Sequence, residues 1–291
     1  MTVIDAHQHF WVLAAHDQPF LRSHPSLAPL LRDFTVGELA PQAAAAGVTG
    51  TVVVQTVLEP GETPELLELA ATGGLVAGVV GWADLEAPDV ADAIAGLLEL
   101  PGGNRLSGLR HPLLGEPDLG WLTRPAVLRG LAVLGKAGLT FDIVAQPGHL
   151  AAAAQAAAET GELRFVLDHL GNPELAAAPD PSWTAGVTAL AAHPNVTCKL
   201  SGILGAPPPG TDPAAPRDPA DVAHLRPYYE TVLGAFGPDR LMFGSDWPVS
   251  TLSASYGHVV AAARALTSEL SKDEQDAIFC RTAQRVYQLP G

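Results

Sequence analysis

Cysteine is scarce in this chain of 291 residues, which contains only Cys198 and Cys280. Two cysteines suit a reducing compartment better than a disulfide framework, and they give no zinc-finger spacing. Neither is flanked in the sequence by a candidate catalytic partner. We therefore expect a cytoplasmic protein without structural disulfides.

Long apolar runs and an N-terminal targeting signal are also missing. Hydrophobic residues make up 47% of the chain, yet no run of 18 apolar residues is present to span a membrane. A secretory signal would begin with a basic stretch followed by an apolar one, and Asp5, His7 and His9 interrupt that pattern. We expect a soluble protein that has no membrane partner.

Basic residues are few, with 16 Lys and Arg against 31 Asp and Glu and a formal net charge of −15. Contact with a phosphate backbone needs a basic surface, so nucleic acid is not an expected partner. Composition leaves the oligomeric state open.

The chain does contain a series of short apolar, β-branched runs separated by segments rich in Ala and Leu at helical spacing. The runs recur close to the interval of about 30 residues that a strand, a crossover helix and the next parallel strand occupy. Eight such units close most simply into a (β/α)8 TIM barrel, with a doubly wound open sheet as the alternative. No G-x-G-x-x-G motif or P-loop follows any run, which favours the barrel. The expected strands are 3–6, 51–55, 75–81, 107–110, 139–144, 164–168, 196–200 and 240–244, and the supporting helices are 88–100, 125–137, 150–160, 183–192, 228–236 and 254–266.

Two segments, 10–33 and 205–221, do not fit this repeat and are long enough to be functional loops. The first follows the first strand directly and should fold over the mouth of the barrel. The second is rich in proline and poor in large apolar residues, so it is expected to be a mobile flap, with a plain linker as the equal alternative. We expect one barrel domain over 1–291.

Histidine and aspartate side chains stand at the ends of three of the expected strands. His7 and His9 point to the same face of the first strand, about 7 Å apart. His169 and Asp246 follow the apolar runs 164–168 and 240–244. In a closed barrel these four side chains would converge at the C-terminal mouth, where barrel enzymes carry out their chemistry.

Imidazole and carboxylate groups of this kind can hold one divalent transition metal, such as zinc or manganese, which activates bound water. Alternatively, Asp246 can activate water without a metal while His7 and His9 donate hydrogen bonds to a substrate carbonyl. The residues alone leave both mechanisms open. The candidate catalytic residues are Asp246 and His169, and the candidate metal ligands are His7, His9, His169 and Asp246.

Four other residues at strand ends are candidates for substrate binding. Arg110 offers a guanidinium fork suited to a carboxylate or an oxyanion, although a structural ion pair is the alternative, and His111 follows it. Either Lys199 or Cys198 must face the barrel interior, and an inward lysine could donate to an anion or hydroxyl. Trp247 should shape the pocket wall. The six remaining histidines lie in expected loops or helices and receive no role: His16, His24, His149, His193, His224 and His258.

Five motifs resemble those of the amidohydrolase superfamily, and more narrowly its branch of sugar-lactone and muconolactone-type lactonases, which are TIM-barrel metal-dependent hydrolases. The similarity runs nearly from end to end of the chain and in order. The motifs are Ile-Asp-Ala-His-Gln-His-Phe-Trp at 4–11, Gly-Leu-Arg-His at 108–111, Phe-Val-Leu-Asp-His-Leu-Gly-Asn-Pro at 165–173, Cys-Lys-Leu-Ser-Gly at 198–202 and Phe-Gly-Ser-Asp-Trp-Pro-Val at 243–249.

This resemblance implies that a small lactone is the substrate and that Asp246 takes a proton from the attacking water and returns it to the departing ring oxygen. His7 and His9 match the family's histidine pair on strand one, His169 its histidine on strand six, and Asp246 its aspartate on strand eight. Strands four and five end without a lysine or glutamate placed to bridge two metals, which implies a single metal or none. The alternatives are a metal-dependent decarboxylase of an aromatic or unsaturated acid and a non-catalytic barrel that binds ligands.

Overall fold

Eight parallel strands, hydrogen-bonded in sequence order, form the centre of the molecule. The computed structural model describes the chain except for residues 1, 177, 209, 212–217, 219 and 291. The first and last strands are joined where the His9 N–H donates to the Trp247 carbonyl at 2.7 Å and the Asp246 N–H to the His7 carbonyl at 2.8 Å. The predicted (β/α)8 TIM barrel is confirmed. Its strands are β1 Ile4–Gln8, β2 Gly50–Val54, β3 Val76–Gly81, β4 Leu106–Pro112, β5 Thr140–Val144, β6 Arg164–Leu167, β7 Val196–Leu200 and β8 Leu241–Phe243.

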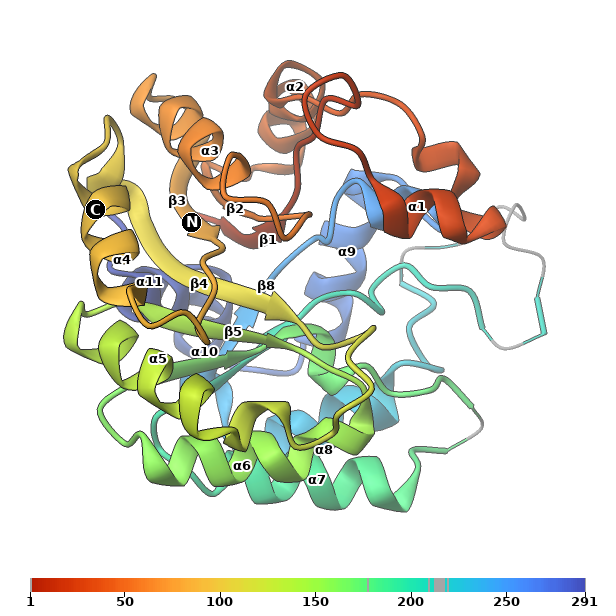
Figure 1. The fold of residues 1–291 in the computed structure, drawn as a ribbon. Helices are drawn as coiled ribbons and strands as arrows, with labels where there is room; N and C mark the ends of the chain where they lie inside the picture. The colour runs from red at the N-terminus through yellow and green to blue at the C-terminus, as the bar shows by residue number, and fades with distance from the viewer. Residues whose placement is uncertain (1, 177, 209, 212–217, 219, 291) are drawn as a thin grey trace.

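Helices surround the strands on the outside, as Figure 1 shows. The six helices expected from Ala- and Leu-rich spacing all form, with ends within a few residues of the expected ones. They are α4 Val90–Glu99, α5 Pro125–Lys136, α6 Leu150–Glu159, α7 Pro181–Ala191, α8 Arg226–Phe236 and α9 Tyr256–Leu266. The helices that we did not expect are α1 Pro19–Ser23, α2 Val36–Ala46, α3 Glu62–Ala71, α10 Lys272–Asp276, the π-helix Ala277–Arg281 and α11 Thr282–Tyr287.

The C-terminal segment packs at the end of the barrel where the strands begin. Val286, Tyr287 and Leu289 share a buried apolar cluster with inward residues of the strands, such as Val52 and Val166. The Arg164 Nε–H at the start of β6 donates to the Val286 carbonyl at 3.1 Å. Because α11 occupies this end, the opposite, C-terminal end of the strands is the one left for a site.

The segment 10–33 lies over the C-terminal end of β1 and β2, in agreement with its expected place. It contains α1 and a 3₁₀ turn at Pro25–Leu30. Gln18 donates to the Thr56 hydroxyl at 2.9 Å, and His16 lies 2.7 Å from a Glu59 carboxylate oxygen. These contacts attach the segment to the chain that follows β2.

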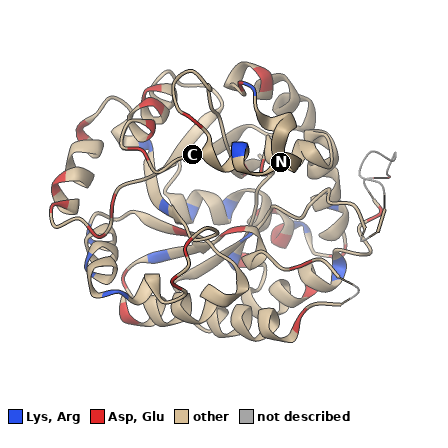
Figure 2. Cartoon of the chain, turned by 45° about the vertical axis from the view of Figure 1, so that its right-hand side comes forward, with Lys and Arg blue, Asp and Glu red and all other residues tan. Residues whose placement is uncertain are grey.

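The proposed flap at 205–221 includes residues that the structure does not describe, namely 209, 212–217 and 219, so it stays a prediction. None of the described helices has both the length and the apolar character needed to cross a membrane. In the view of Figure 2, acidic and basic residues are interspersed over the outer helices.

Candidate active site

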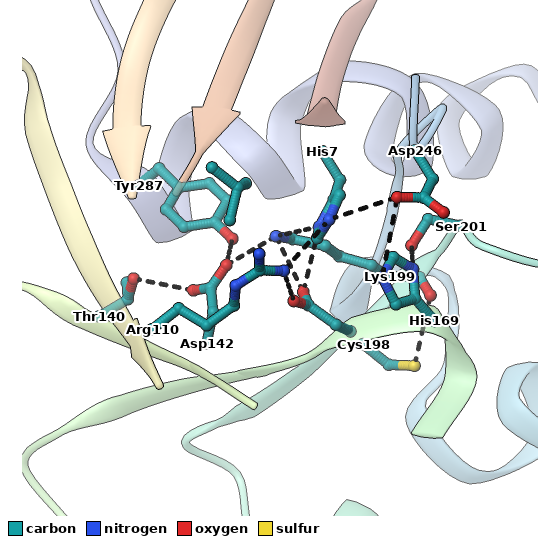
Figure 3. Close-up of polar contacts among 12 residues, drawn as sticks. His7, Arg110, Thr140, Asp142, His169, Cys198, Lys199, Ser201, Asp246 and Tyr287 are labelled. Atoms are coloured by element: carbon teal, nitrogen blue, oxygen red, sulfur yellow. Dashed lines mark hydrogen bonds and ion pairs between the residues drawn. The ribbon is translucent and has the colours of Figure 1, made fainter. Parts of the chain in front are cut away.

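Three imidazoles and one carboxylate meet at the C-terminal end of the barrel, and Figure 3 shows His7, His169 and Asp246 among them. Asp246 Oδ1 lies 3.7 Å from His7 Nε2, 3.6 Å from His9 Nε2 and 4.0 Å from His169 Nε2. His7 is fully buried, whereas the other three residues keep 6–8% of their surface exposed. The four residues predicted from the strand ends therefore surround one point, and Asp246, His9 and His169 are the ones that solvent can reach.

Two of these side chains stand on strained backbone. His169 and Asp246 follow β6 and β8 with φ values of 54° and 58°, in the left-handed region that non-glycine residues seldom adopt. Such conformations cost about 1–3 kcal/mol each and gather at functional sites. Asp246 is held by its N–H bond to the His7 carbonyl, and His169 Nδ1 lies 2.9 Å from the Ser201 hydroxyl. This left-handed backbone directs both side chains from the strand ends toward the centre of the site.

Gly202 gives His169 the space that this arrangement needs. Its φ is +75°, and a Cβ added there would lie 2.6 Å from His169 Cγ and Nδ1. Gly202→Ala is therefore expected to push the imidazole off its position and to lower kcat by at least about tenfold, since a displacement of about 1 Å in a site can cost about 100-fold. Steady-state kinetics of the two proteins measure the loss.

A second glycine supplies the control for that substitution. Gly234 lies exposed in α8 with ordinary φ, and no heavy atom lies within 4 Å of an added Cβ. Gly234→Ala should leave kcat unchanged, because it removes only chain flexibility. Full activity in Gly202→Ala would show that His169 does not depend on this space.

The side-chain donors fit one divalent ion. In a tetrahedral site with bonds of about 2.0–2.1 Å to nitrogen, ligand atoms lie roughly 3.3 Å apart. Here the ligand atoms of His7, His169 and Asp246 all lie within 4.8 Å of one another. His9 Nε2 adds a fourth donor, 3.2 Å from His7 Nε2.

Hydrogen bonds on the far side of the rings also suit a metal site. His9 Nδ1 lies 2.7 Å from the Val54 carbonyl, which can only accept, so Nδ1 carries the proton and Nε2 is free to bind. Histidine ligands of metals are oriented in this way, by donation from the other ring nitrogen. Burial lowers the pKa of His7 well below its ordinary value and lowers that of His169 as well, so both rings are neutral, as ligation requires.

A buried ionic network lies directly beneath these rings. Lys199 Nζ lies 2.6 Å from Asp142 Oδ2 and 3.0 Å from Asp168 Oδ1, and all three side chains are fully buried. Arg110 forms an ion pair with Asp168 at 3.2 Å, and the Tyr287 hydroxyl donates to Asp142 Oδ2 at 2.6 Å. The network attaches β4, β5, β6 and β7 to one another and to α11.

The two carboxyl groups of this network differ in their pKa. Burial raises the pKa of Asp142 above its ordinary value, although the Lys199 ammonium opposes the rise. For Asp168, burial acts in the same direction but is outweighed by Lys199, His7 and Arg110, which hold its pKa well below the ordinary value. Asp168 is therefore the permanent anion beneath His7.

The structure places the four candidate substrate-binding residues in different surroundings. Lys199 faces inward and Cys198 outward into the apolar core, but the Lys199 ammonium is surrounded by protein groups. Trp247 is fully buried, with edge contacts to two phenylalanine rings. Arg110 is in the ion pair that we considered as its alternative, with 6% of its surface exposed.

His111, the next residue on β4, contacts the segments that follow β3 and β4. It stacks on Trp121 with ring centroids 4.2 Å apart, and Trp82 Nε1 lies 3.4 Å from His111 Nδ1. It is only partly buried, so of the four candidates His111 is the one placed to meet a ligand over a wide face.

Sequence reasoning assigned no role to Asp168, Asp142 or Tyr287. A signal for the first was present, because Asp168 stands directly before His169 at the end of an apolar strand. Asp142 lies inside the apolar strand β5, where an inward carboxylate implies a buried cation nearby. Tyr287 could not be found, because nothing in the sequence shows that the last helix packs into the barrel.

Comparison with known proteins adds to this geometry. A family model described as amidohydrolase matches residues 4–289. An L-fucono-1,5-lactonase from Burkholderia ambifaria is 37% identical over 254 residues, which cover 87% of this chain and 83% of the relative. A second L-fucono-1,5-lactonase, from Burkholderia multivorans, is 36% identical over 99% of this chain and 96% of its own length.

Solved structures from Burkholderia multivorans are similar as well. A crystal structure of an amidohydrolase with bound HEPES superposes with a TM-score of 0.89 at 35% identity and covers all of both chains. Another, with bound zinc, has a TM-score of 0.88 at 36% identity over the same extent.

Proposed function

This chain belongs to the amidohydrolase family and is a hydrolase of sugar lactones, and we propose that its substrate is a sugar-acid 1,5-lactone of the L-fucono type. One observation carries the mechanism that we propose: a carboxylate, Asp246, has three imidazole Nε2 atoms within 4.0 Å at the open end of the barrel. Such a site can take a proton from water beside groups that polarise a carbonyl.

Asp246 acts as the general base in this proposal. Its backbone is fixed by the His7 carbonyl, and its side chain keeps 7% exposure, so water and substrate can reach Oδ1 and Oδ2. Water attacks the lactone carbonyl carbon while Asp246 removes one of its protons. When the ring carbon–oxygen bond breaks, Asp246 returns that proton to the departing oxygen, and the product is the open hydroxy acid.

His7, His9 and His169 would hold one divalent ion, zinc or manganese, through their Nε2 atoms. When bound, such an ion supplies Lewis acidity toward the carbonyl and the attacking water. His9 is oriented for this task by Val54 and His169 by Ser201, so neither ring must reorganise when substrate arrives. The relative with bound zinc supports this part of the proposal.

Substrate recognition involves Arg110 and His111. His111 presents a partly exposed imidazole that is stacked on Trp121, and such planes can pack on the C–H face of a sugar ring. Arg110 keeps 6% of its surface exposed beside the His7 imidazole, although its Nε is buried and has no hydrogen-bond partner among the described residues. Lys199 and Trp247, by contrast, are assigned to positioning, because their surroundings leave no open path to substrate.

A lactone panel followed by proton release tests the substrate class. We expect L-fucono-1,5-lactone to have a kcat/KM at least about tenfold above that of muconolactone, because a polyol offers hydrogen bonds that a muconolactone lacks, and sites built for hydroxyl groups reject analogues without them. L-galactono-1,5-lactone, which adds one hydroxyl at C6, measures discrimination within the sugar series.

Two other outcomes would contradict this proposal. Carbon dioxide released from aromatic or unsaturated acids, without lactone hydrolysis, would indicate the decarboxylase alternative. No turnover of either panel by folded protein loaded with zinc or manganese would indicate a barrel that only binds ligands.

A further inference from the structure

The His7 ring has both a hydrogen-bond donor and an acceptor beside each of its nitrogens. At Nδ1, Lys199 Nζ lies 3.0 Å away and Asp168 Oδ1 3.3 Å. At Nε2, His9 Nε2 lies 3.2 Å away and Arg110 Nη1 3.4 Å. A neutral imidazole carries one N–H and one lone pair, so it can satisfy only one donor and one acceptor at a time. Two complete sets of partners are present for two tautomers.

The shorter set of contacts, to Lys199 at Nδ1 and to His9 at Nε2, favours one tautomer of His7. His9 Nδ1 carries its proton toward the Val54 carbonyl, which leaves His9 Nε2 as an acceptor. The 3.2 Å contact between the two Nε2 atoms then needs the proton of His7 Nε2. With its proton there, His7 Nδ1 is an acceptor and receives an N–H from Lys199 at 3.0 Å. Every donor in the chain from Lys199 to Val54 faces an acceptor.

The longer set, Asp168 Oδ1 at Nδ1 and Arg110 Nη1 at Nε2, serves the other tautomer. Asp168 Oδ1 is fully buried and accepts no well-aligned hydrogen bond from any described residue, although Lys199 and His7 lie close to it. A buried carboxylate oxygen without an aligned hydrogen bond is destabilised, although the Lys199 ammonium 3.0 Å away offsets part of that cost. A proton on His7 Nδ1 would supply its partner and would leave His7 Nε2 bare, the form that can bind a metal.

We infer that Lys199 and Asp168 form a tautomer switch that couples the His7 ring to metal occupancy. Lys199 favours the Nε2–H tautomer, which closes the site when no ion is bound, and Asp168 favours the Nδ1–H tautomer, which opens Nε2 to an ion. In the exchange one N–H bond is lost at Nε2 and one forms at Nδ1, so the charge of the ring is unchanged. This inference rests on the proposed metal-assisted function for its purpose, but not for its test.

The switch implies that Lys199 weakens metal binding. Partners of this kind change metal affinity by about 10–100-fold, so Lys199→Met should bind zinc about 10–100-fold more tightly than the wild type. Removal of a positive charge would by itself also attract a cation. The double variant Lys199→Met with Asp142→Asn removes one charge of each sign and keeps Asp168 in place. This double variant should keep the higher zinc affinity of Lys199→Met if the change of tautomer is the cause.

The tautomer itself can be observed in the unaltered protein. Long-range ¹H–¹⁵N spectra of protein labelled at histidine distinguish a protonated ring nitrogen from a bare one, and the His7 signals are identified by their loss in His7→Asn. We expect a bare Nδ1 without metal, a bare and then metal-bound Nε2 when zinc is added, and a bare Nε2 in metal-free Lys199→Met.

Several results would overturn the switch. One is a His7 ring that already carries its proton on Nδ1 in the metal-free wild type. Another is a return of zinc affinity to the wild-type value in the charge-balanced double variant, and a third is the absence of zinc binding in both wild type and Lys199→Met. Should the variants fail to fold, the wild-type spectra still decide. None of these readouts uses catalysis, so the switch and lactone hydrolysis can fail separately.

Discussion

Asp246→Asn is expected to lower kcat for lactone hydrolysis by about 10²–10⁴-fold, the contribution of a positioned general base. The amide keeps the shape of the carboxylate but cannot take a proton from water or return one to the ring oxygen. Steady-state kinetics with L-fucono-1,5-lactone, corrected for spontaneous hydrolysis, measure the loss. KM should change less than kcat, because the proton transfers occur in the transition state.

The Asn variant should also fold normally, so a loss of activity would not come from unfolding. Asparagine tolerates the left-handed backbone that Asp246 adopts at φ 58°, so the strand end need not rearrange. Asp92→Asn, an exposed carboxylate on α4, controls for the change in net charge and should keep full activity. A value of kcat near that of the wild type in Asp246→Asn would remove Asp246 from the mechanism.

The strands of the barrel were predictable because each is mostly apolar, although charged residues such as Asp142 and Lys199 lie within β5 and β7. A parallel strand covered on both faces has no alternation of polar residues, so its limits are visible as a run such as 164–168, which the structure has at Arg164–Leu167. Helices were found where Ala and Leu dominate, as in 150–160. They were missed where composition is mixed: α2 has Pro41 inside it, and α3 begins with acidic residues.

The convergence of His7, His9, His169 and Asp246 followed from topology, because the C-terminal ends of neighbouring strands meet at one mouth. The surroundings of Lys199 did not follow. Its inward direction is one of two choices on the strand, and its depth depends on Asp142 and Asp168 from two other strands. Sequence spacing shows which end of a strand a residue occupies, but not how many partners already surround it.

Removal of metal is the second experiment with a large expected effect. Exhaustive treatment with a chelator should lower lactone hydrolysis by about 10³-fold or more, since Lewis-acid assistance is worth several kcal/mol and each 1.36 kcal/mol is a factor of ten. Added zinc or manganese should restore the rate. The control is the melting temperature, which must show that the protein stays folded without metal.

How easily a chelator removes the ion depends on the hydrogen bonds that the His7 ring forms once the ion has left. In the wild type the departing ion leaves a His7 whose Nε2–H is accepted by His9 and whose Nδ1 accepts from Lys199, so the empty site is already satisfied. We therefore expect chelation of the wild type at lower chelator concentration than in Lys199→Met. A rate that survives complete removal of metal would instead assign the carbonyl to the imidazoles directly, with the His7 Nε2–H as the donor.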